Sequence, residues 1–141
     1  TVWAFATAGV EAPLMFVAVA AETRRKLPMY NAHDMANTVW AYAKAGVSAP
    51  ELFEAVAAEA LTKMPKFHSM NYSYTDTAQG KELHDAPLKT VTFDSHDLAV
   101  TAWAYATAGV LAPALFQAVA GESSKKMTFF NPQNLANTVW A

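Results

Sequence analysis

The sequence predicts an all-α protein, and more specifically an α-solenoid built from helix-turn-helix repeats. A repeated motif is the first reason. Thr-x-Trp-Ala occurs four times and contains every tryptophan of the chain: Trp3, Trp40, Trp103 and Trp140. The second reason is their spacing of 37, 63 and 37 residues, which indicates a 37-residue period with one 26-residue insertion.

This spacing divides the chain into three units, a partial fourth unit and the insertion. The units cover about residues 1–30, 31–67, 93–130 and 131–141, and the insertion covers about 67–92. The chain begins and stops in the same Thr-Val-Trp-Ala string, which is predicted to be the middle of a helix. Solenoids normally end in polar capping units. We therefore expect this single solenoid segment to be an excerpt of a longer array.

The first helix of each unit is predicted from its end signals. Asn31 can act as an N-cap by accepting a free backbone N–H, and Asp94 and Asn131 hold the same place in later units. The helix of the second unit is expected from about Ala32 to Ala45. Gly46 would end it in the left-handed conformation that C-terminal caps favour. The equivalent glycines of the other units are Gly9 and Gly109.

A second helix is predicted to follow after a short turn. Ser48 is expected to cap it, with Pro50 in its first turn and Glu51 three residues after the serine. We expect this helix to run to about Met64 and to stop at Pro65. Apolar side chains recur at helical steps along it, at Leu52, Phe53, Val56, Ala57, Ala60 and Met64.

The insertion lies between Lys66 and Thr92, at the junction of two units. Its sequence is polar and poor in aliphatic residues, so most of it is expected to be a surface loop. A short helix over Thr75–Asp85 is one alternative. Tyr72 and Tyr74 either stack on the bases of a nucleic acid or are simply solvated aromatic residues of the loop.

The first helix is predicted to have one packed face and one free face. At 100° per residue, the packed face contains Ala32, Met35, Ala36, Val39 and Ala43. The free face contains His33, Asp34, Asn37, Ala41 and Lys44, with Trp40 at its edge. The variable positions of this free face, which we call the polar stripe, are His33, Asn37, Lys44, His96, Val100, Thr107, Gln133 and Asn137.

Two interpretations of the polar stripe are open. A constant scaffold that carries changing side chains is what modular reading of a polymer requires. Val100 departs from the amides at Asn37 and Asn137, because a valine contacts the face of a base but cannot hydrogen-bond to its edge. Alternatively, exposed positions vary because little constrains them, and the constant Ala41 reflects close packing by the neighbouring repeat.

The formal net charge is −2, so the sequence does not predict a strongly basic surface. The basic residues follow the second helices, at Arg24, Arg25, Lys26, Lys63, Lys66, Lys125 and Lys126. They either contact phosphates or only stabilise helix C-termini. If about four of them contacted RNA phosphates, log K would fall with log salt at a slope of roughly −3.

Enzymatic and membrane functions are not predicted. The dipeptide His-Asp occurs at His33, His84 and His96, but first-turn capping explains two of these sites without a metal. No nucleophile with a partner at a meaningful spacing and no phosphate-binding loop is present. We therefore expect no catalysis, metal, cofactor or small-molecule substrate, and no apolar run is long enough to span a membrane.

The string Leu135-Ala136-Asn137-Thr138-Val139-Trp140-Ala141, continued in another copy by Tyr42-Ala43-Lys44-Ala45-Gly46, resembles the octotricopeptide and heptatricopeptide helical repeats that often accompany RAP domains. The resemblance covers the chain except for the insertion. It implies sequence-selective binding of single-stranded RNA in mitochondria or chloroplasts, in RNA processing, stability, translation or ribosome assembly. It also implies that the polar stripe faces successive bases.

The rival function is a structural or protein-binding solenoid within a large organellar assembly. The near-neutral charge and the alanine-rich surface favour this alternative. A continuous basic groove would favour RNA, whereas a broad apolar face would favour a protein partner.

Overall fold

A computed structural model describes residues 1–64 and 93–141, and its regular structure there is entirely helical. No β-strand occurs within these two ranges, so the predicted all-α class is confirmed. The α-helices are α1 (Val2–Ala8), α2 (Pro13–Lys26), α3 (Ala32–Ala45), α4 (Pro50–Lys63), α5 (Ser95–Ala108), α6 (Pro113–Lys126) and α7 (Pro132–Trp140). Two short 3₁₀ helices, η1 (Leu27–Met29) and η2 (Met127–Phe129), follow α2 and α6.

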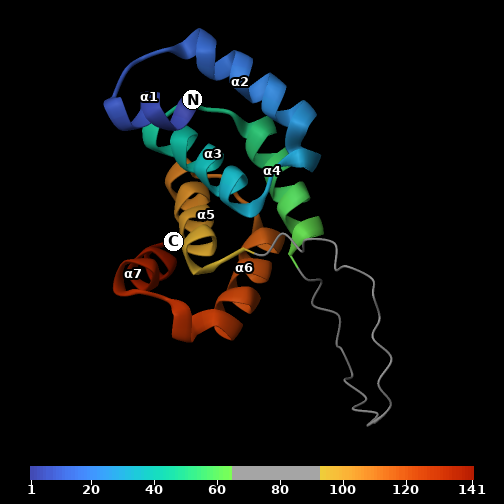
Figure 1. Ribbon diagram of the computed structural model, residues 1–141, viewed down its shortest axis with the longest axis vertical. Coiled ribbons are helices and arrows are strands. Elements are labelled where there is room, and N and C mark those ends of the chain that lie inside the picture. The colour runs from blue at the N-terminus through green and yellow to red at the C-terminus, as the bar shows by residue number, and fades with distance from the viewer. Residues whose placement is uncertain (65–92) are drawn as a thin grey trace, which may run out of the picture.

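The helices form two layers. Helices α1, α3, α5 and α7 contact one another in succession, and we call them the first-helix layer. Helices α2, α4 and α6 also contact one another in succession, and they form the second-helix layer. Figure 1 shows the first-helix layer on the inner side of an arc and the second-helix layer on its outer side. Every helix of the inner layer is therefore flanked by the equivalent helix of another unit.

The ends of the first helices follow the predicted chemistry. Asn31 and Asp94 cap α3 and α5, each accepting the backbone N–H of the residue three positions later. Asn131 caps α7 in the same way. The glycines after α1, α3 and α5 have φ near +66°, which a residue with a Cβ adopts only at a cost. These predicted helix boundaries are confirmed.

The start of the second helix differs from the prediction. Helix α4 begins at Pro50, its N-cap is Ala49, and no side chain caps it. Ser48 is therefore not the capping residue. The reason is that proline takes the first helical position, where no N–H partner is needed, so the half-helical cap position falls on Ala49.

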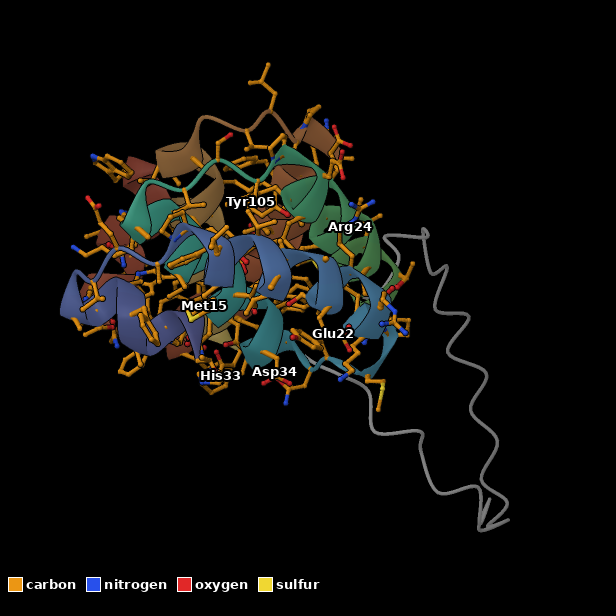
Figure 2. All side chains as sticks on the ribbon, turned by 90° about the horizontal axis from the view of Figure 1, so that it is seen from above. Met15, Glu22, Arg24, His33, Asp34 and Tyr105 are labelled. Carbon is orange, nitrogen blue, oxygen red and sulfur yellow. The ribbon has the colours of Figure 1, made fainter. Side chains whose placement is uncertain are left out.

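Two tyrosines join the layers across unit boundaries. The Tyr42 hydroxyl of α3 donates to the Phe16 carbonyl of α2 at 2.6 Å, and Tyr105 of α5 donates to the Phe53 carbonyl of α4 at 2.6 Å. Each pair of rings also packs edge to face, with centroids 5.1 Å and 5.0 Å apart. Both tyrosines are fully buried, and Figure 2 shows Tyr105 within the packed centre. Burial raises the pKa of Tyr42 to about 12.

A lysine at the end of the second helix holds the linker that precedes the first helix of its own unit. The Lys63 ammonium donates to the Pro28 carbonyl at 3.1 Å and to the Tyr30 carbonyl at 2.6 Å. In the next unit Lys126 donates to the Phe93 carbonyl. These contacts repeat because the residues occupy equivalent positions of the two units.

Predictions for the insertion fall outside the described residues. They concern Lys66, the loop, the helix over Thr75–Asp85, Tyr72 with Tyr74, and the dipeptide His84–Asp85. Among the helices that are described, none has the length and apolar character that crossing a membrane would require.

Candidate functional site

The polar stripe lies on the first-helix layer, and most of its members are exposed. His33 and Lys44 are exposed on α3, His96 and Thr107 on α5, and Gln133 on α7. The predicted packed face of α3 is buried at all five of its positions, Ala32, Met35, Ala36, Val39 and Ala43. The division of this helix into two faces is therefore correct at these positions.

The middle of the stripe is less accessible. Asn37 and Asn137 are half-buried, and Val100 is buried at 9 % exposure. The prediction that Ala41 lies on the free face is wrong, because Ala41 and its equivalent Ala104 are completely buried. Ala4 of α1, which no preceding helix of the described chain covers, is exposed. The constant alanine thus marks close packing between neighbouring first helices.

The four tryptophans lie on the same layer and meet in pairs. The ring centroids of Trp3 and Trp40 are 6.4 Å apart, and those of Trp103 and Trp140 are 6.3 Å apart. Trp40 and Trp103 are half-buried against the core, whereas Trp3 and Trp140 are 52 % and 64 % exposed. Trp40 lies three residues after Asn37 and four before Lys44 on α3, so its indole is next to the stripe on the surface of this helix.

Carboxylates or carbonyls engage most of the basic side chains. Arg24 pairs with Glu51, and Arg25 and Lys26 both pair with Glu22. Lys63 pairs with Glu59. Lys125 and Lys126 pair with Glu122. Within residues 1–64 and 93–141, Lys44 is the one basic side chain without such a partner. Figure 2 shows that Arg24 of the predicted basic set lies apart from His33 of the polar stripe.

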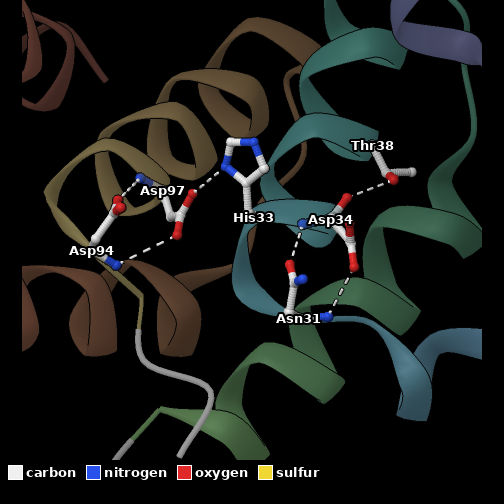
Figure 3. Close-up of polar contacts among 6 residues, drawn as sticks. All are labelled: Asn31, His33, Asp34, Thr38, Asp94 and Asp97. Atoms are coloured by element: carbon white, nitrogen blue, oxygen red, sulfur yellow. Dashed lines mark hydrogen bonds and ion pairs between the residues drawn. The ribbon is translucent and has the colours of Figure 1, made fainter.

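A contact between two units was not expected from the sequence. His33 of α3 meets Asp97 of α5, with Nδ1 and Oδ1 3.1 Å apart (Figure 3). The Asp97 side chain is only 5 % exposed and that of His33 is 60 % exposed. Burial raises the pKa of Asp97, and the hydrogen bond from His33 opposes this shift. The contact was missed because it joins residues 64 positions apart, although the repeat register would have aligned them.

The histidines of neighbouring units also come together. The ring centroids of His33 and His96 are 6.2 Å apart with a tilt of 36°. No group of three or more metal-binding side chains forms anywhere in the part of the chain that the structure describes. The capping boxes hold the aspartates of the dipeptides His33-Asp34 and His96-Asp97, since the carboxylates of Asp34 and Asp97 accept the backbone N–H of Asn31 and Asp94.

Equivalent pockets lie at two unit boundaries, at the C-terminal ends of the first helices. One has a volume of about 420 Å³ and includes Glu11 and Lys44 among its lining residues. The other has a volume of about 380 Å³ and includes Ser48 and Thr107 at the equivalent positions. Most of the remaining lining is small and apolar in both pockets. The two pockets thus differ at these two polar positions and at Phe5, whose equivalent in the other pocket is Tyr42.

Comparison with known proteins assigns the chain to no family. Neither the known protein families nor the curated protein sequences contain a match. The resemblance to octotricopeptide and heptatricopeptide repeats therefore stays a prediction.

Proposed function

We propose that this all-α chain is a segment of an α-solenoid with a 37-residue unit and that it binds single-stranded RNA without performing chemistry. One observation carries the proposal. Equivalent positions of successive first helices present different polar side chains, such as Lys44 and Thr107 or His96 and Gln133, on one layer that keeps small residues such as Ala36 and Ala99 at its packed positions. Such an arrangement suits the reading of one polymer element per unit.

The surroundings of the stripe favour bases over phosphates. Indole rings border it, and aromatic side chains stack on bases at ~1–3 kcal/mol per base. Most cations are already paired with carboxylates of the same chain, so they have little charge to offer a phosphate. We therefore expect weak binding with a salt slope near −0.7, the value for about one phosphate contact, instead of roughly −3.

Fluorescence anisotropy with a labelled random-sequence RNA tests the proposal. The chain should bind single strands in preference to duplexes, and binding should quench tryptophan fluorescence because the indoles border the stripe. The triple variant His33→Ala, Asn37→Ala, Lys44→Ala should lose ~10-fold or more in affinity. Glu54→Ala, at an exposed position of the second-helix layer, is the matched control and should bind normally. Equal loss in both variants would contradict the proposal.

A protein partner is the second candidate, and the paired cations favour it. A solenoid with little free positive charge has a weak electrostatic attraction for RNA. In this case the chain would be a structural subunit of a larger assembly. Crosslinking in cells separates the two candidates. Recovery of crosslinked RNA fragments supports RNA binding, whereas a crosslinked partner that remains after ribonuclease treatment is a protein and supports the second candidate. The resemblance to octotricopeptide and heptatricopeptide repeats implies a mitochondrion or chloroplast as the location for either function.

A further inference from the structure

We propose that Asp97 is a positioning residue that fixes the hydrogen-bonding pattern of His33, so that His33 presents its Nε2 as an acceptor and selects a ligand group that donates. The ligand class is a base with an exocyclic amino group, which adenine, cytosine and guanine carry, in preference to uracil, which has none. This ligand clause rests on the proposed RNA function, whereas the positioning of His33 does not.

The Asp97 carboxylate is held in place from two sides. Its Oδ2 accepts the backbone N–H of Asp94 at 3.4 Å, and its Oδ1 lies 3.1 Å from His33 Nδ1. The side chain is only 5 % exposed, so neither oxygen is free to turn towards solvent. An ionised carboxylate only accepts hydrogen bonds. Its partner nitrogen, His33 Nδ1, must therefore carry the hydrogen.

The second ring nitrogen of His33 then has a defined role. In a neutral imidazole, a hydrogen on Nδ1 leaves Nε2 as an acceptor, and the partner of one nitrogen decides the state of the other. Nε2 lies on the side of the ring away from Asp97 (Figure 3). The ring is 60 % exposed on the polar stripe, so this acceptor is open to a ligand.

The charges around His33 favour a base edge over a phosphate. Asp97 and His96 belong to α5, which packs against α3, and Asp94 caps α5. Asp34 is the neighbour of His33 on its own helix. Asp34 and Asp94 are exposed carboxylates and repel phosphate. A neutral donor such as an amino group suffers no such repulsion.

The next unit supplies a natural contrast. His96 is equivalent to His33, but Asn134 of α7 stands where Asp97 stands on α5. The Asn134 Nδ2 donates to the Ser95 hydroxyl at 3.5 Å, and an amide, which both donates and accepts, does not impose one tautomer on an imidazole. Asn134 is also 5 % exposed, and its backbone N–H likewise donates to the side chain of the cap residue, Asn131, so an asparagine is compatible with this buried position. Asp97→Asn should consequently fold.

The first experiment measures the tautomer directly, without RNA. Long-range ¹H–¹⁵N NMR spectra of the chain at pH 8 should show His33 with its hydrogen on Nδ1 only, and Asp97→Asn should give a mixture of tautomers. Asn134→Asp is the matched gain-of-carboxylate variant and should shift His96 towards the Nδ1–H form. A hydrogen on His33 Nε2 in the unmodified chain, or an unprotonated Nδ1 that accepts from Asp97, would overturn the inference.

The second experiment tests the ligand clause by selecting bound molecules from a random RNA pool at pH 8. The unmodified chain should enrich adenine, cytosine or guanine over uracil at one position by roughly 2- to 10-fold, the change in affinity expected from one hydrogen bond. Asp97→Asn should keep its binding and lose this preference. A preference for uracil, or a preference that Asp97→Asn retains, would overturn the ligand clause. No RNA binding by a chain with the expected tautomer would instead overturn the proposed function.

Discussion

A buried hydroxyl on the second-helix layer has a hydrogen-bond partner only where the linker after that helix supplies one. The Thr23 hydroxyl lies 3.2 Å from the Tyr30 hydroxyl. At the equivalent positions of the third unit, Ser123 is 2 % exposed and faces a linker that has Phe130 in place of the tyrosine. Ser123 Oγ has no hydrogen-bond partner. The serine therefore bears the cost of desolvation without the compensating bond.

Replacing this serine should stabilise the protein. We expect Ser123→Ala to raise the free energy of unfolding by ~1 kcal/mol, because the unpaired hydroxyl is removed. Thr23→Val is the matched control and should lower it by ~1 kcal/mol, because it removes a hydroxyl that does have a partner. Urea denaturation measures both changes. Destabilisation by Ser123→Ala would show that the hydroxyl contributes a contact after all.

Asp97 should leave a signature in the pH dependence of stability. Its folded-state pKa is raised above 3.8 by burial, so the folded state holds its proton more tightly than the unfolded state. Its contribution to stability is therefore largest below pH 3.8 and decreases as the pH rises through the raised folded-state pKa. The stability of Asp97→Asn relative to the unmodified chain should increase with pH over this window. A constant difference, measured by urea denaturation from pH 3.5 to 7, would contradict the raised pKa.

At the scale of the element, the sequence predicted those features of a helix that depend on residues within the same helix turn. Asn31, Asp94 and the glycine caps predicted the ends of the first helices correctly, because capping involves only residues within one turn. Ser48 was assigned wrongly because Pro50 determines where the half-helical residue falls.

Contacts between units could not be obtained from one helix alone. A helical wheel placed Ala41 on the free face, since it contains no neighbouring helix. The same limitation applies to His33 and Asp97, which are brought together by the packing of α3 on α5. Periodicity predicts which face of a helix is apolar, but only the stacking of units decides which polar residues meet.

The linker contacts of the second helices should contribute to stability. Lys63→Met should lower the free energy of unfolding by ~1–2 kcal/mol, because two backbone carbonyls lose their ammonium donor. Arg25→Met is the control, since its ion pair with Glu22 is exposed and its loss should cost ~0.5 kcal/mol or less. Similar effects of the two substitutions, measured by chemical denaturation, would rule out a structural role for Lys63.

At the scale of the whole molecule, an interior tryptophan should matter more than one at an end of the described chain. Trp40 is half-buried on a helix that α1 and α5 both contact, whereas Trp3 is 52 % exposed. Trp40→Ala should lower the free energy of unfolding by ~2–4 kcal/mol and Trp3→Ala by less than half as much. Asn37→Ala should change it by less than ~1 kcal/mol. Circular dichroism during urea unfolding checks this order, and a larger loss for Asn37→Ala would mean that this residue holds the fold.

The two tyrosine contacts between layers have a consequence for recombining units. Tyr42 and Tyr105 each bond a backbone carbonyl of the preceding unit, and every residue type offers a carbonyl. This hydrogen bond does not depend on which side chain the preceding unit has at that position. A unit that carries the tyrosine can therefore be duplicated, deleted or exchanged while the hydrogen bond between units is kept. The order of polar residues along the array is then free to change through rearrangement of whole units, without a new interface being required each time.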